Sequence, residues 1–200
     1  MAEFRLKLSS AAVWFLLILL SACAGVTPPP STGMAKQVKL AALTHWRLEG
    51  RIAVQTPDDA FQASLFWEHE RQQDRVRVSG PFSQGTFSII LQDDLIFIRD
   101  SSGNTKSSRN VPALLQQELG FAVPLSSLRY WVLGVPAPSV IAGQASYDQG
   151  GLLRQLRQDG WRLDFQSFVP AGDYLLPQKL AAQGRDLKLK LFVDDWVIVR

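Results

Sequence analysis

The sequence of 200 residues predicts a mainly β protein, with one antiparallel sheet of about eleven strands and short helices inserted in the middle. Apolar and polar residues alternate with a period of two through most of the chain, which is typical of half-buried antiparallel strands. Turn signals such as Asp159-Gly160 separate the alternating segments. Between residues 110 and 136 the spacing changes to a helical one. With 46% hydrophobic and 20% charged residues, the composition is that of a globular protein.

The first 22 residues predict a signal peptide. Arg5 and Lys7 precede an apolar segment of ten residues, Ala11–Leu20. That segment is too short to cross about 30 Å of hydrocarbon as a helix. The following Leu20-Ser21-Ala22-Cys23 matches the lipobox of bacterial lipoproteins, whose cysteine is lipidated and becomes the first residue after cleavage. Cys23 is therefore the predicted lipid anchor, and an ordinary signal peptide followed by a chance cysteine is the alternative.

The rest of the chain predicts a tether and one domain. Residues 23–33 contain the lipidated cysteine and a flexible segment rich in Pro, Ser, Thr and Gly, and residues 34–200 form the β-domain. Of the formal charge of +3, the leader contributes +1 through Arg5, Lys7 and Glu3, so the mature chain is nearly neutral. Because no cluster of basic residues stands out, a nucleic-acid partner is not expected.

The elements follow in order along the domain. A helix is expected over residues 34–44, where apolar residues have helical spacing. Five alternating segments then predict strands over residues 46–55, 61–68, 75–78, 87–92 and 95–99. One short helix begins after Asn110 and ends at Gly120, and a second begins near Ser126 or Ser127 and ends at Gly134. Further strands are expected over residues 146–158 (one or two), 161–165, 174–180, 187–193 and 196–199.

Catalytic and metal-binding motifs are not apparent, so neither an enzyme nor a cofactor is expected. A single cysteine excludes an internal disulfide and a cysteine-rich zinc site. The chain has no Gly-x-Ser-x-Gly elbow, no phosphate-binding glycine loop and no HExxH. His69 lies between Glu68 and Glu70, but neighbours in a strand point to opposite faces, so it is expected to be a solvated histidine near a turn. The acidic pairs are interpreted as turn residues: Asp58-Asp59, Asp93-Asp94 and Asp194-Asp195.

Several segments resemble the outer-membrane lipoprotein receptor LolB family. Besides the lipobox, they are residues 46–54 (WRLEGRIAV), 66–67 (FW), 80–82 (GPF), 124–136 (PLSSLRYWVLGVP), 160–162 (GWR) and 187–196. The resemblance implies a half-open antiparallel β-barrel whose mouth is covered by helices. It also implies a receptor that accepts triacylated lipoproteins from the periplasmic carrier LolA and inserts them into the outer membrane.

Location and partners follow from the same resemblance. Ala24 stands where many lipoproteins retained in the inner membrane have aspartate, so the periplasmic face of the outer membrane of a Gram-negative bacterium is expected. The implied partners are LolA, acylated lipoprotein cargo and outer-membrane lipids, and the protein is expected to be a monomer without cofactor.

Two groups of site residues are predicted. The inward faces of the strands and the second helix would line an acyl-chain cavity through Ile52, Leu65, Trp67, Phe87, Ile89, Phe165, Leu128 and Trp131. The alternative is that these residues are ordinary core. In the loop Gly80–Gly85, Phe82 follows Pro81 where the family has an apolar residue implicated in delivery to the bilayer; a Phe82 folded back on the barrel is the alternative.

Three other functions remain open at this stage. An outer-membrane lipoprotein could scaffold envelope assembly through exposed sheet edges, without binding acyl chains. A lipoprotein binder like the soluble carrier would conflict with the lipobox, because a shuttle must leave the membrane. A lipid-modifying enzyme would need the nucleophile and base that the sequence lacks.

Overall fold

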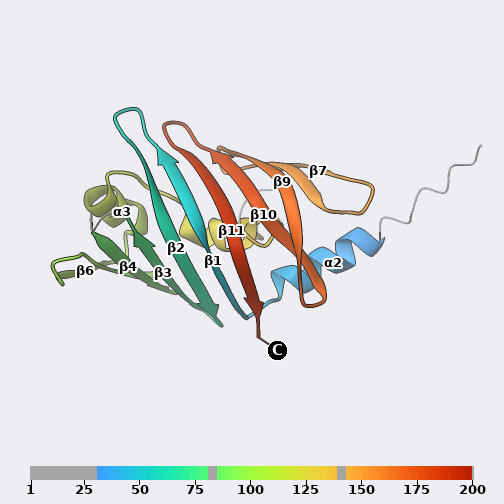
Figure 1. Cartoon of the computed structure of the whole chain (residues 1–200), viewed down its shortest axis with the longest axis horizontal. Helices are drawn as coiled ribbons and strands as arrows, with labels where there is room; N and C mark the ends of the chain where they lie inside the picture. Colours follow the sequence, from blue (N-terminus) through green and yellow to red (C-terminus); the bar gives the residue numbers. More distant parts are fainter. Residues whose placement is uncertain (1–30, 81–84, 139–142, 200) are drawn as a thin grey trace, which may run out of the picture. The chain divides into compact units, whose positions relative to one another are not determined.

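The computed structural model describes residues 31–80, 85–138 and 143–199. The chain divides into two units, residues 1–32 and 33–200, and all the strands belong to the second. Its eleven strands form one antiparallel sheet with the order β6-β5-β4-β3-β2-β1-β11-β10-β9-β8-β7 (Figure 1). The strands β6 and β7 form two free edges, so the sheet is not closed. The predicted mainly β, half-open antiparallel fold is confirmed.

The strands have the following bounds: β1 His45–Gln55, β2 Ala60–Glu70, β3 Gln73–Ser79, β4 Thr86–Gln92, β5 Leu95–Arg99, β6 Thr105–Ser108, β7 Gln144–Tyr147, β8 Leu153–Gln158, β9 Trp161–Ala171, β10 Tyr174–Gln183 and β11 Lys188–Ile198. Each half of the sheet is a run of hairpins, and β1 pairs with β11 where the two halves meet (Figure 1). The turn between β8 and β9 is the predicted Asp159-Gly160 hairpin, in which both residues have positive φ (53° and 73°).

Two strands differ from the sequence expectation. The strand β6 (TKSS) was not expected because it contains no apolar residue that could reveal an alternation. The expected break at Asp194-Asp195 is absent, and these residues lie inside β11 rather than in a turn. Glu49 pairs with Asp195 and Gly50 with Val193, so Asp194 is the extra residue of a β-bulge. A Cβ at Gly50 would collide with the carbonyl oxygen of Phe192, which explains why glycine stands opposite the bulge.

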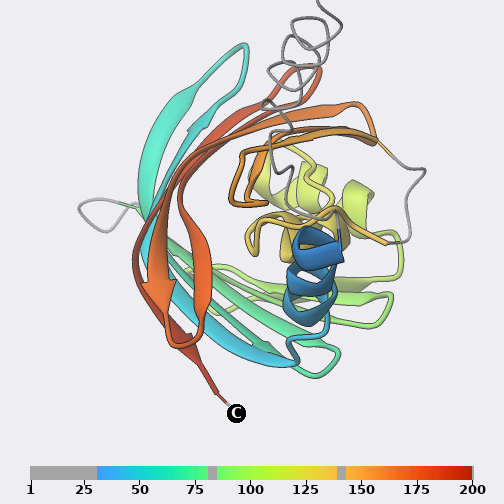
Figure 2. The same cartoon turned by 90° about the vertical axis from the view of Figure 1, so that its right-hand side faces the viewer.

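Three helices accompany the sheet: α2 Ser31–Ala41, α3 Val111–Leu119 and α4 Leu125–Trp131. The side chain of Asn110 caps α3 by accepting a hydrogen bond from the backbone N–H of Ala113, and Gly120 ends it with φ 80°. The helices α3 and α4 lie in sequence between β6 and β7, the two edges of the sheet. Figure 2 shows α3 and α4 inside the curve of the sheet, so they cover its concave face.

The core lies between the concave face and these helices. Trp46 and Leu48 of β1 are fully buried there, together with Leu115 of α3 and Trp131 of α4. The opposite, convex face of the central strands is mainly charged, with Arg47, Glu49 and Arg51 of β1 alternating with the buried residues. The period of two in the sequence therefore corresponds to a concave apolar face and a convex polar face.

Candidate functional site

An apolar cavity of about 290 Å³ lies between the concave face of the sheet and the helical connection. Its walls come from β1 to β4 and β11, from α3 and α4, and from the segment that joins these two helices. Apart from Asp59, Glu118, Gly80 and Gly85, every residue of the lining is hydrophobic. A cavity with such a lining offers contacts to an apolar ligand and almost no hydrogen-bonding partners to water.

Six of the eight predicted cavity residues line it: Ile52, Leu65, Trp67, Phe87, Ile89 and Leu128. Two others lie elsewhere. The indole of Trp131 donates to Gln158 on the far side of α4, and the ring of Phe165 stacks on Phe168 at 6.3 Å between centroids. Both are buried core residues outside the cavity lining, because α4 turns Trp131 towards β8 and Phe165 lies in the other half of the sheet.

Several lining residues were not anticipated from the sequence. On the strands they share the inward face with the predicted residues, so the alternation could have identified Val54, Phe61, Ala63, Val76, Val78 and Leu189. The segment between α3 and α4 carries Phe121, whose ring lies 6.2 Å from that of Phe61. No periodicity could have revealed this contact, since residues 120–124 belong to no regular element.

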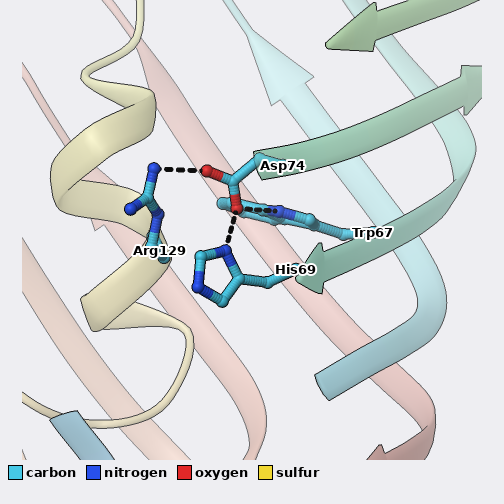
Figure 3. A network of polar contacts seen from close by, with 4 residues as sticks. All are labelled: Trp67, His69, Asp74 and Arg129. Carbon is cyan, nitrogen blue, oxygen red and sulfur yellow. Dashed lines mark hydrogen bonds and ion pairs between the residues drawn. The ribbon is translucent and has the colours of Figure 1, made fainter. Parts of the chain in front are cut away.

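A buried ionic cluster fixes α4 beside the cavity (Figure 3). The carboxylate of Asp74, only 1% exposed, accepts from Trp67 Nε1 at 3.0 Å and lies 2.9 Å from His69 Nδ1 through the same oxygen, Oδ1. Its Oδ2 lies 2.5 Å from Nη2 of Arg129 on α4. A carboxylate that lacks such partners would be costly to bury, so the cluster specifies where α4 docks on β2 and β3.

The environment of His69 corrects one expectation. His69 is 4% exposed and packs against Trp46, with 5.4 Å between ring centroids, whereas a solvated position was predicted. The prediction was wrong because the alternation places His69 on the inward face and Asp74, its partner, directly opposite it in register. The importance of Asp74 and Arg129 was also missed, since neither carries a recognisable motif.

A second buried polar contact holds the chain after α4. The side-chain oxygen of Gln158 accepts from Trp131 Nε1 and from the backbone N–H of Ala137, both at 2.9 Å. Its amide nitrogen donates to the carbonyl oxygen of Ala137 at 2.9 Å. Gln158 therefore ties the helical connection to β8, on the other side of α4 from the Asp74 cluster.

Three predicted residues fall outside the described ranges: the anchor Cys23 and the loop residues Pro81 and Phe82. Within the described ranges, no three His, Cys, Asp or Glu side chains gather as they would around a metal ion. In the same ranges, no helix combines the length and apolar character needed to cross a membrane.

Comparisons with known proteins agree on one family. Residues 44–196 match the family described as "Outer membrane lipoprotein LolB". A protein named outer-membrane lipoprotein LolB from Pseudomonas paraeruginosa is 30% identical over 202 aligned positions, which cover 97% of this chain and 96% of that protein. One of the same name from Ectopseudomonas mendocina is 30% identical over 192 positions, 92% of this chain and 94% of that protein.

Among solved structures, a similar fold occurs in a domain from Vibrio parahaemolyticus that is proposed to be an outer-membrane lipoprotein-sorting protein. The TM-score is 0.54 at 8% sequence identity, over 84% of this chain and 91% of that chain. At this identity the likeness concerns the fold alone.

Proposed function

Because the chain belongs to the outer-membrane lipoprotein LolB family, we propose that it is an outer-membrane lipoprotein that receives triacylated lipoproteins from LolA and inserts them into the outer membrane. A role in lipoprotein localisation is the common ground of the family and of its named members. The observation that carries the finer proposal is the apolar cavity of about 290 Å³ beneath α3 and α4.

The physical need for such a cavity follows from the cargo. Each methylene group costs about 0.8 kcal/mol when it is exposed to water. Exposing three acyl chains of about 15 methylenes per chain would therefore cost roughly 35 kcal/mol. A receptor must therefore shield the chains during transfer, and no covalent bond needs to form or break. The direction of transfer can come from an affinity for the acyl chains that increases from the carrier to the receptor and from the receptor to the bilayer. The cavity of about 290 Å³ is close to the lower end of the range for ligand pockets, about 300–1,000 Å³.

Two further parts of the proposal concern the membrane. Lipid chains on Cys23 would hold the protein at the outer membrane, since single-chain anchoring is marginal and several chains are stable. Replacing Cys23 by serine should then abolish incorporation of labelled palmitate.

Phe82 would contact the bilayer during delivery. The Phe82→Glu protein should accept cargo but insert it poorly, and normal insertion would refute this role.

The test of the cavity uses two adjacent positions on β2. Ala63 lines the cavity, whereas Ser64 lies on the convex face. Ala63→Leu fills part of the cavity, and Ser64→Leu adds the same group outside it. LolA loaded with a labelled lipoprotein is mixed with each full chain carrying Cys23→Ala, and the cargo on each protein is measured after separation.

We expect several-fold less cargo on the Ala63→Leu protein than on the Ser64→Leu protein, which should match the parent. Cargo that stays on LolA with the parent chain would refute the receptor function and favour the scaffold alternative, which needs no cavity. Equal loading of the two variants would refute the cavity as the acyl-chain site.

A further inference from the structure

The convex face of the central strands carries a group of cations around one aromatic ring. Phe192 of β11 points outward and lies in register with Arg51 of β1 and Lys179 of β10. The guanidinium carbon of Arg51 lies 4.7 Å from the ring centroid, and Nζ of Lys179 lies 5.5 Å from it. Cations at these distances are attracted to the ring face, so Phe192 holds them at two neighbouring strands.

A hollow lies beside this ring because the residues that flank Lys190 on the two neighbouring strands are small. Lys190 of β11 pairs with Ala53 on one side and Ala181 on the other. The two alanines leave space of about 410 Å³, bordered by Arg51, Lys179, Lys190 and Phe192. We call this hollow the cationic groove.

The charges in the cationic groove do not balance. Arg51 is paired, with Nη2 2.9 Å from Oδ1 of Asp194, the residue of the β-bulge. No carboxylate of the described residues forms an ion pair with Lys179 or Lys190. Two uncompensated ammonium groups thus border one hollow, and an anion placed between them would be attracted by both.

We propose that the cationic groove binds the phosphate of anionic phospholipid headgroups and so rests the convex face on the bilayer; this inference rests on the proposed function at the outer membrane. Phosphate is a preferred partner of Lys and Arg, and basic surfaces near a membrane are attracted to anionic lipids. Phe192 and the alanines offer apolar contacts to the glycerol region beside the phosphate.

The convex face continues from the cationic groove towards the end of β3. Arg51 also lines an adjoining hollow on the convex face, which extends to Ser79 at the end of β3. The groove and this hollow therefore lie on the convex side of the sheet, whereas the acyl-chain cavity opens on the concave side.

The experiment compares two vesicle compositions with the full chain. The protein is reconstituted into vesicles of phosphatidylcholine alone or of phosphatidylcholine and phosphatidylglycerol in a two-to-one ratio, and lysine acetylation is quantified by mass spectrometry. We expect Lys179 and Lys190 to react about tenfold more slowly in the anionic vesicles. Lys36 and Lys39, exposed on α2, should react alike in both. Equal reactivity of Lys179 and Lys190 in both vesicles would overturn the proposal.

A matched pair of variants distinguishes binding at the cationic groove from an effect of the net charge of the protein. K179E/K190E and K36E/K39E change the net charge equally, and circular dichroism checks that both are folded. Both variants also carry Cys23→Ala, which removes the acyl anchor, and the ratio of the partition coefficients onto anionic and neutral vesicles cancels the contribution of apolar segments. We expect this ratio to fall about tenfold for K179E/K190E relative to K36E/K39E. Equal ratios would overturn the proposal.

Two controls identify other ligands of the groove. Protection of Lys179 and Lys190 by inorganic phosphate without vesicles would assign the groove to free phosphate, and protection by LolA without lipid would assign it to a protein partner; either result would overturn the lipid proposal. Cargo transfer from LolA is measured without vesicles, so its failure, with lysine protection intact, would refute the proposed function separately.

Discussion

The strands β1 and β11 build two unlike surfaces from alternate residues. On the concave side, Ile52 and Leu189 line an apolar cavity. On the convex side, Arg51 and Lys190 border a cationic groove. A register shift of one residue would exchange the two sets, placing charges in the core and leucines in water. One pair of strands thus carries an apolar cavity lining on one face and a charged surface on the other, because the pleat separates them.

Polar contacts on the two faces should also differ in energy. The concave cluster of Asp74 is almost fully buried, so its charges have lost their water and depend on one another. On the convex face, Arg75 lies 3.2 Å from Glu68, but both side chains are more than a third exposed. Water and salt screen such a pair, which therefore contributes little to the stability.

The largest effect is expected from Asp74→Ala. The substitution leaves Arg129 and His69 without their common carboxylate, and the free energy of unfolding should fall by roughly 3–5 kcal/mol. In the same hairpin, Glu68→Ala should cost less than about 1 kcal/mol. Urea unfolding followed by far-ultraviolet circular dichroism measures both. Similar losses in the free energy of unfolding for the two variants would show that the buried polar contacts do not contribute more to the stability than the exposed ones.

A smaller effect is expected from Gln158→Leu. The N–H groups of Trp131 and Ala137 and the carbonyl of Ala137 would lose their partner, and we expect a loss of roughly 2–3 kcal/mol in the free energy of unfolding. Gln155 of the same strand is exposed, so Gln155→Leu should stay within about 0.5 kcal/mol of the parent. If Gln158→Leu were equally neutral, the helical connection would not depend on this contact.

The smallest effect concerns Asp148, in the turn between β7 and β8. Burial raises the pKa of its carboxyl, but hydrogen bonds from the backbone of Leu152 and Gly150 and from Arg154 outweigh burial and lower the pKa below its usual 3.8. A carboxyl with a lowered folded-state pKa stabilises the fold above the unfolded-state pKa, and this contribution disappears as the pH falls through the folded value. At neutral pH the free energy of unfolding of the parent should exceed that of the Asp148→Asn protein by less than about 1 kcal/mol.

This difference should shrink below pH 4, which urea unfolding at several pH values measures. A difference that grows on acidification would contradict the lowered pKa.

The alternation of residues allowed most of the fold to be predicted. It located ten of the strands at least in part, and the caps Asn110 and Gly120 located α3. It failed for β6, where TKSS forms an edge strand without a hydrophobic face. It also failed at Asp194, since a bulge keeps acidic residues inside a continuous strand. Six cavity residues were identified because an inward direction is a local property of a strand.

The sequence by itself therefore determined the fold class, the family resemblance and the side of the sheet on which each residue lies. The tertiary structure decided which inward residues share a cavity and which merely form core, as for Trp131 and Phe165. It also brought Arg129 to Asp74 and gathered Arg51, Lys179 and Lys190 at one groove beside Phe192. The physical reason is that periodicity reports only the direction of a side chain, whereas its partners depend on strand order and on the path of the connection across the concave face.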